Sequence, residues 1–193
     1  KTFGASGNYT AKAIVYNGPY CADTSSLTVK VGGHSDIAIQ ANDTLLCAAN
    51  ANFSLTVNKN AGPAIKTYGW NLWADKTQTL NKFLPVNDYQ VIAITTNDEK
   101  CDDTAFINLH VVAHPKSTIV NSTLDLQCLK NNQFRFQANT VGGAPSYLYN
   151  WVVDQVKISS DNTYDYNYPT AKKDIIIVYT KDANNCMDTT TYK

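Results

Sequence analysis

A four-residue element, Cys-x-Asp-Thr, occurs three times in this chain of 193 residues and constrains its fold more than any other feature. The cysteines of the three copies are Cys21, Cys101 and Cys186, which are 80 and 85 residues apart. Similarity at a nearly fixed spacing is the mark of an array of repeated structural units. The sequence therefore predicts tandem modules rather than one large domain.

A second set of intervals supports the same register. A cysteine is followed after six residues by a phenylalanine and after 23 residues by a tryptophan, and this set occurs as Cys47, Phe53 and Trp70 and again as Cys128, Phe134 and Trp151. We therefore expect the C-terminal half of a module at residues 1–33, a complete module at 34–113 and a nearly complete module at 114–193.

Within each module, apolar residues recur at every second position. Phe53, Leu55 and Val57 alternate with Ser54 and Thr56, and turns rich in Asn, Gly and Asp separate such runs. This alternation is typical of half-buried β-strands, and many short strands with regular turn signals are typical of an antiparallel sandwich. The sequence predicts an all-β chain of immunoglobulin-like sandwich modules, joined by junctions short enough to give a semi-rigid rod. The expected core residues are Trp70, Trp151, Phe53 and Phe134.

The charge balance excludes several functional classes. Sixteen Lys and Arg residues against sixteen Asp and Glu residues leave no basic field that would attract nucleic acid or an anionic membrane. The sequence has no run of about 18 or more apolar residues, so direct membrane insertion is not expected, and no signal peptide is visible.

No catalytic, cofactor-binding or metal-binding motif is present, and the three histidines, His34, His110 and His114, lack the spacing of metal ligands. The nearest set of oxygen ligands lies around Asp161 and Asp165 and would suit calcium, but a polar loop before a strand explains the same residues. We expect no enzyme activity, no cofactor and no metal ion.

The combined pattern resembles a known family. An early cysteine, a Phe-containing strand, Tyr-x-Trp at Tyr68 and Tyr149, and Cys-x-Asp-Thr after an Asn-rich turn are similar to the polycystic-kidney-disease (PKD) domain. More narrowly, the chain resembles the cysteine-bearing PKD-like repeats of large Bacteroidetes cell-surface adhesins, of the SprB gliding-motility type. The resemblance covers the whole chain, although Asp174 stands where the other two units have a tyrosine.

The resemblance implies a structural repeat segment of an extracellular adhesin or filament on the cell surface, serving adhesion or gliding motility without catalysis. Its partners would be neighbouring modules of the same chain, other filament or surface proteins, or surface polysaccharide. The alternative is an accessory carbohydrate-binding region of a secreted polysaccharide-degrading enzyme. A third hypothesis is a eukaryotic receptor ectodomain, with N-glycans at Asn8, Asn42, Asn52 and Asn121.

Paired recurrence of the cysteines favours disulfides within such repeats, and disulfides persist in oxidising surroundings outside the cytoplasm. The expected bridges are Cys47 to Cys101 and Cys128 to Cys186, each tying one end of a sandwich. Cys21 would pair with a cysteine upstream of the present sequence.

Two features are candidates for binding. Trp73 lies three residues after Trp70, so on a continuous strand it would face away from the core and could stack on a sugar or a neighbouring module. The second feature is an outward row of large side chains that recurs in successive units and would form an assembly surface. Its members in the two later modules are Ile92, Ile94, Ile175, Ile177 and Tyr179.

The resemblance to Bacteroidetes proteins also suggests O-glycosylation. Thr44, Thr104 and Thr189 each follow an aspartate and precede an apolar residue or threonine, the pattern used by that group. The alternative is that Asp-Thr simply begins a strand after a turn.

Overall fold

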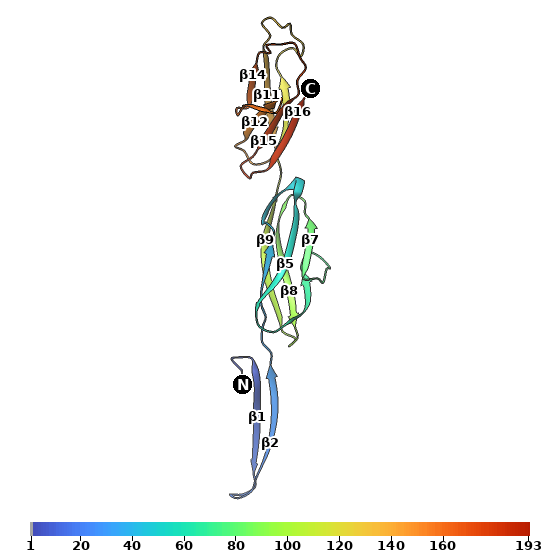
Figure 1. Cartoon of the computed structure of the whole chain (residues 1–193). Helices are drawn as coiled ribbons and strands as arrows, with labels where there is room; N and C mark the ends of the chain where they lie inside the picture. Colours follow the sequence, from blue (N-terminus) through green and yellow to red (C-terminus); the bar gives the residue numbers. More distant parts are fainter. Residues whose placement is uncertain (1) are drawn as a thin grey trace. The chain divides into compact units, whose positions relative to one another are not determined.

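The computed structural model describes residues 2–193, and almost all of their regular structure is β-strand (Figure 1). Five sheets are present in this part of the chain: one of two strands, two of three strands and two of four strands. This confirms the all-β fold class that the period-two alternation predicts.

The first sheet is a hairpin of β1 (Gly7–Tyr16) and β2 (Ala22–Val31), in which Gly7 pairs with Val31 and Tyr16 with Ala22. Its side chains are exposed along nearly the whole length of both strands. Leu27 and Val15, for example, are 65% and 68% exposed. The hairpin thus has the strands of a sandwich without a facing layer among the described residues.

The first sandwich pairs a three-stranded sheet with a four-stranded sheet. The three-stranded sheet has the order β3 (Asp36–Ala41), β5 (Asn52–Ala61), β7 (Thr79–Phe83). The other sheet has the order β4 (Leu45–Cys47), β9 (Asp102–Val112), β8 (Asn87–Asn97), β6 (Ile65–Trp70). A short 3-10 helix, η1 (Ala48–Asn50), links β4 to β5.

The core of the first sandwich follows from the alternation of its central strands. Phe53, Leu55 and Val57 of β5 are fully buried, and Val91 and Ala93 of β8 face them from the other sheet with no exposed area. Trp70 closes this core, and its indole Nε1 donates a hydrogen bond to the Thr77 carbonyl at 3.0 Å. A buried indole N–H needs such a partner, because an unpaired donor is costly in an apolar core.

The second sandwich repeats this three-plus-four arrangement. Its three-stranded sheet has the order β10 (Lys116–Asn121), β11 (Phe134–Val141), β14 (Thr163–Tyr166). Its four-stranded sheet has the order β13 (Val156–Ser159), β12 (Leu148–Val153), β15 (Ile176–Lys181), β16 (Met187–Tyr192). Trp151 is fully buried at its centre and donates through Nε1 to the Asp161 carbonyl at 2.8 Å.

One expected core residue of the second sandwich lies elsewhere. Phe134 is half-buried, and Phe136, two residues further along β11, is the phenylalanine with only 3% of its area exposed. Phe134 is the first residue of β11, so it lies at the end of the sheet and packs against the rings of Phe136 and Tyr168. The matching six-residue interval from the cysteine therefore does not carry the same burial in both sandwiches.

By contacts, the chain forms two compact units, and their limits do not follow the sequence repeats. The first unit holds the chain up to Thr44 together with Phe53–Lys82 and Tyr89–Leu109. The second holds His110–Lys193 and two segments from the middle of the sequence, Leu45–Asn52 and Phe83–Asp88. The repeat boundaries inferred from the sequence stay a prediction.

The disulfide pairing expected from the sequence is wrong. Cys47 is bonded to Cys186, 139 residues away, whereas Cys21, Cys101 and Cys128 are free thiols. The reason lies in the parallel pairing of β4 with β9, which puts Cys47 opposite Val112 at the end of β9. Cys101 immediately precedes β9, so at about 3.3 Å per residue roughly 35 Å of strand separates it from Cys47.

Candidate functional site

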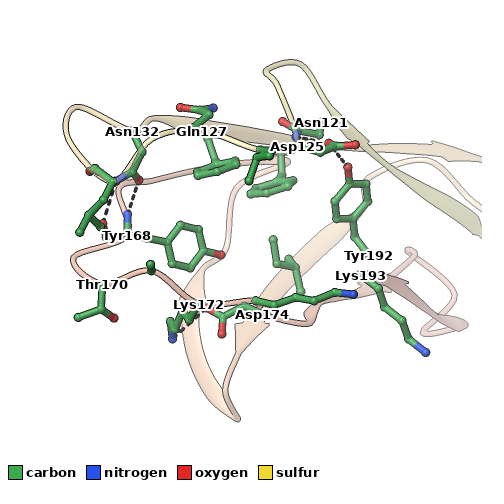
Figure 2. A pocket seen from close by; sticks show the side chains of 17 residues that line it. Asn121, Asp125, Gln127, Asn132, Tyr168, Thr170, Lys172, Asp174, Tyr192 and Lys193 are labelled. Atoms are coloured by element: carbon green, nitrogen blue, oxygen red, sulfur yellow. Dashed lines mark hydrogen bonds and ion pairs between the residues drawn. The ribbon is translucent and has the colours of Figure 1, made fainter.

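The candidate site is a cavity of about 460 Å³ at one end of the second sandwich (Figure 2). Residues on two irregular segments supply most of its lining: the connection from β10 to β11, and the chain that leads from β14 to β15. Residues at the end of the chain, Tyr192 and Lys193, complete the wall.

Asn132 holds the two irregular segments together. Its side chain is 6% exposed; its amide nitrogen donates to the carbonyls of Leu129 at 2.7 Å and Tyr168 at 2.9 Å, and its amide oxygen accepts the Tyr168 N–H at 2.6 Å. Figure 2 shows these bonds beside the Tyr168 ring. One buried amide thus fixes the distance between the two walls of the cavity.

An aromatic cluster forms the floor of the cavity. The Phe134 ring meets the Tyr168 ring edge-on, with centroids 5.4 Å apart, and Tyr168 meets Tyr166 in the same manner at 4.6 Å. The pKa of the Tyr168 hydroxyl is raised, first by burial and then by the nearby Asp174 carboxylate. Tyr168 therefore stays a neutral hydrogen-bonding group at physiological pH.

Lys172 carries the charge at one side of the cavity. Its ammonium group lies 2.7 Å from Asp154 Oδ2 and 2.9 Å from Asp174 Oδ2, and 5.8 Å from the centre of the Tyr168 ring. Hydrogen bonds to these two carboxylates raise the pKa of Lys172. Because the Asp174 side chain is only 6% exposed, Lys172 acts as its counter-ion.

A second polar group lies on the opposite side of the cavity, where the Tyr192 hydroxyl donates a hydrogen bond to Asp125 (Figure 2). Asn121 Nδ2 also donates to Asp125 Oδ1, at 2.7 Å. These two donors lower the pKa of Asp125, the tyrosine hydroxyl contributing most. Both carboxylates of the cavity, Asp125 and Asp174, are thus ionised and already hydrogen-bonded or ion-paired.

This arrangement is suited to binding. Its aromatic floor, buried amide and fixed charges are groups that hold a polar chain segment or a sugar by stacking and hydrogen bonds. Sequence reasoning missed the cavity residues Asn132, Tyr168 and Lys172. The available signal was the alternation Tyr164, Tyr166, Tyr168, which runs beyond the last residue of β14.

Three turns of the same construction present the hairpin cysteines. The backbone N–H of residue i donates to the carbonyl of the cysteine at i+4 in Asn17 with Cys21, Asn97 with Cys101, and Asp182 with Cys186, at 2.8, 3.0 and 2.9 Å. In the last two turns the side-chain Oδ1 of residue i also accepts the cysteine N–H, at 3.0 and 2.8 Å. The residue before each of these two cysteines, Lys100 or Asn185, has a positive φ of 63° or 64°.

Trp73 lies beyond the strand on which its orientation was predicted, because β6 ends at Trp70. Its side chain is half-buried, and Lys82 Nζ lies 5.7 Å from the ring centre. The argument from strand alternation therefore fails at this position, and binding by Trp73 stays a prediction.

The outward row has intermediate exposure. Ile94 and Ile175 are 45% and 51% exposed, while Ile92, Ile177 and Tyr179 are half-buried. On β8 and β15 the alternate positions, such as Val91 and Val178, are fully buried. The row is thus on the outer faces of the two four-stranded sheets, and its contact with a partner stays a prediction.

The candidate glycosylation threonines, Thr44, Thr104 and Thr189, are exposed. In the first two, the preceding aspartate accepts the threonine N–H through Oδ1, at 2.7 Å for Asp43 and 3.0 Å for Asp103. The third differs, because Asp188 Oδ2 instead accepts the Ser117 N–H at 2.6 Å. Local hydrogen bonding thus gives Asp-Thr a structural role in each sandwich, and modification stays a prediction.

Within residues 2–193, no cluster of three or more His, Cys, Asp or Glu side chains is close enough to bind a metal ion. Asp165, one of the candidate calcium ligands, instead pairs with Arg135 Nε at 3.2 Å. The described chain also has no helix with the length and apolar character needed to cross a membrane.

The chain matches no family model and no curated protein. Several solved structures resemble it at low sequence identity. The fibronectin(III)-like modules of Clostridium thermocellum CbhA are 12% identical, with a TM-score of 0.45, over 79% of this chain and 90% of that chain. A 1.5-MDa bacterial ice-binding adhesin is 14% identical, with a TM-score of 0.41, over 97% and 73%. Murine CEACAM1b is 11% identical, with a TM-score of 0.39, over 82% and 98%.

Proposed function

We propose that this chain is a structural repeat segment of an extracellular adhesin or surface filament. Its modules act as spacers, and the adhesive contacts are made by the assembled array. Within this class, the sequence resemblance favours PKD-like repeats of a gliding-motility adhesin. The proposal includes no catalytic activity, because the polar groups of the cavity in the second sandwich already hold each other in structural bonds.

The observation that carries the proposal is the Cys47–Cys186 disulfide. Cys47 belongs to the repeat at 34–113 and Cys186 to the repeat at 114–193, so the bond links two successive copies of the sequence pattern. A disulfide that closes a loop of this length stabilises the folded chain by about 5 kcal/mol in the chain-entropy model. Such a bond is kept in oxidising surroundings, which favours a location outside the cytoplasm.

Antibodies raised against this chain test the proposal on intact cells that produce the full protein. We expect surface labelling that external protease removes, and Cys47 and Cys186 that resist alkylation until a reductant is added. A protein found only inside cells, with both thiols reduced, would contradict it.

The aromatic cavity supports a second candidate function, an accessory carbohydrate-binding region. Phe134 and Tyr168 offer apolar ring surface beside the polar groups Lys172 and Asn132, which is a pattern that suits a sugar. Glycan-array binding that a Tyr168→Ala variant loses, together with a hydrolase domain in the full protein, would favour this function. Absence of glycan binding by the folded wild-type chain would leave the spacer function.

A further inference from the structure

The cavity end of the second sandwich corresponds in sequence to the end of the preceding repeat that carries Cys47. Cys128 follows Cys47 by 81 residues, the same interval that separates Trp151 from Trp70. The segment Leu45–Asn52 therefore corresponds to residues 126–133. Counted from the hairpin cysteines, Phe83–Asp88 corresponds to residues 168–173.

These corresponding segments have different surroundings. Leu45–Asn52 and Phe83–Asp88 are packed in the same compact unit as Cys186, to which Cys47 is bonded. Residues 126–133 and 168–173 instead line the open cavity. Cys128 is exposed, and both of its chain neighbours, Gln127 and Leu129, belong to that lining. The cavity is thus the same end of a repeat without the hairpin that fills this place on the preceding one.

We propose that the cavity and Cys128 form a socket for the cysteine-bearing hairpin of another repeat of this kind. The turn from Asp182 to Cys186 shows what the socket receives, because the turn from Asn97 to Cys101 has the same backbone and side-chain hydrogen bonds. Cys128 is bonded to the hairpin cysteine of that repeat, as Cys47 is bonded to Cys186. The linkage therefore recurs from one repeat to the next along an array.

The bond forms by a balanced oxidation. Two thiols join through one S–S bond and release two protons and two electrons. A small disulfide oxidant such as oxidised glutathione accepts them, and its own S–S bond is cleaved to two thiols.

The other end of the chain provides an independent observation. Cys47 pairs with Val112 in the ladder between β4 and β9, and Gly32 has the place of Val112 when the repeats are aligned on Cys21 and Cys101. A Cβ placed on Gly32 would lie 2.8 Å from Cys101 Sγ. The Cys101 thiol therefore lies where the early cysteine of a repeat completed on the β1–β2 hairpin would arrive.

Linkage at every junction would change how an array carries load. Each early cysteine would be bonded to the next hairpin cysteine, so consecutive closed loops would overlap along the sequence. A pulling force would pass from bond to bond, crossing only short segments such as residues 101–128 between them. Such an array would extend little even if individual sandwiches unfolded.

A lengthened chain tests the socket. Residues 109–193 are added after Lys193 as a second copy, because Lys193 corresponds to Asn108 when Cys186 is aligned with Cys101. The copy carries Cys128→Ser, so only the original Cys128 remains, and Met187→Leu, so its hairpin peptide has a distinct mass. The protein is refolded in a mixture of reduced and oxidised glutathione and mapped by non-reducing mass spectrometry.

We expect the original Cys128 to be joined to Cys186 of the copy, while Cys47 stays joined to the original Cys186. A matched chain with Cys186→Ser in the copy should leave Cys128 open to alkylation. The Cys47–Cys186 bond reports that the chain has folded. If that bond forms and Cys128 is still fully alkylated in the lengthened chain, the proposal is wrong.

Discussion

The Cα atoms of Cys47 and Cys186 lie 5.7 Å apart although 139 residues of sequence separate them. The bond closes a loop that contains most of both sandwiches. Any force applied to the two ends of the chain therefore passes through the disulfide, and the residues between the two cysteines are shielded from it.

This shielding predicts a difference in stretching experiments. At 3.3–3.6 Å per extended residue, the closed loop withholds roughly 460–500 Å of chain length. Single-molecule stretching of the oxidised chain should reach a contour length shorter by that amount than the chain in reductant. Equal contour lengths in the two conditions would show that the bond does not form, and a Cys47→Ser variant should behave like the reduced chain with or without reductant.

The sequence predicts the architecture well because its signals are local. The alternation around Phe53 and the tryptophans at 70 and 151 depends on strand period and burial, and the structure buries all three side chains. Each signal is complete within a few residues. The fold class therefore follows from the sequence alone.

The disulfide could not be inferred in the same way, because it depends on strand direction. The prediction of Cys47 with Cys101 assumed that a cysteine before one strand and a cysteine before another lie at the same end of a sandwich. The parallel pairing of β4 with β9 puts them at opposite ends. The cavity was missed for a related reason, since Asn132 and Tyr168 meet only through hydrogen bonds between two irregular segments.

The position of the Cys101 thiol predicts that a cysteine introduced at Gly32 will bond to it. The 2.8 Å between a Cβ at residue 32 and Cys101 Sγ is short enough for a bridge, since linked Cβ atoms are about 3.5–4.5 Å apart. Gly32→Cys should lose two free thiols, counted with a chromogenic disulfide, relative to the same variant in reductant. The double variant with Cys101→Ser is the control and should keep the thiol introduced at position 32 reactive.

Burial predicts unequal effects of two tryptophan substitutions. Trp151 is fully buried and bonded to the Asp161 carbonyl, so Trp151→Ala should lower the free energy of unfolding by about 3–5 kcal/mol. Trp73→Ala should cost about 1 kcal/mol or less, because the side chain is half-buried and lies outside the strands. Urea titrations followed by tryptophan fluorescence measure both, and equal losses would contradict the packing.

Glu99 predicts a dependence of stability on pH. Its carboxylate accepts the Gly33 N–H at 2.6 Å and pairs with Lys30 at 2.7 Å, and these contacts, the Gly33 bond first, lower the pKa of Glu99 below its ordinary 4.5. A carboxyl with a lowered pKa contributes stability that is fully present above its unfolded pKa and is lost as the pH falls through its folded pKa.

The corresponding measurement compares wild type with Glu99→Gln. At pH 7 the variant should have the lower free energy of unfolding, and the difference should close as the pH falls below about 4.5 and both proteins carry a neutral side chain. Asp88, whose Oδ1 lies 2.8 Å from His110 Nδ1 and whose side chain is 82% exposed, offers a control. Asp88→Asn should leave the curve between about pH 3 and pH 5 nearly unchanged.

The two faces of β8 predict opposite results for the same kind of substitution. Ile94 is on the outer face and 45% exposed, whereas Val91 is on the inner face and fully buried. Threonine keeps the β-branched shape that suits a strand, so Ile94→Thr should shift the free energy of unfolding by less than about 0.5 kcal/mol. Val91→Thr puts a hydroxyl into the apolar core and should cost about 1–3 kcal/mol. If thermal and urea unfolding showed the larger loss for Ile94→Thr, the outer face of β8 would have to be covered.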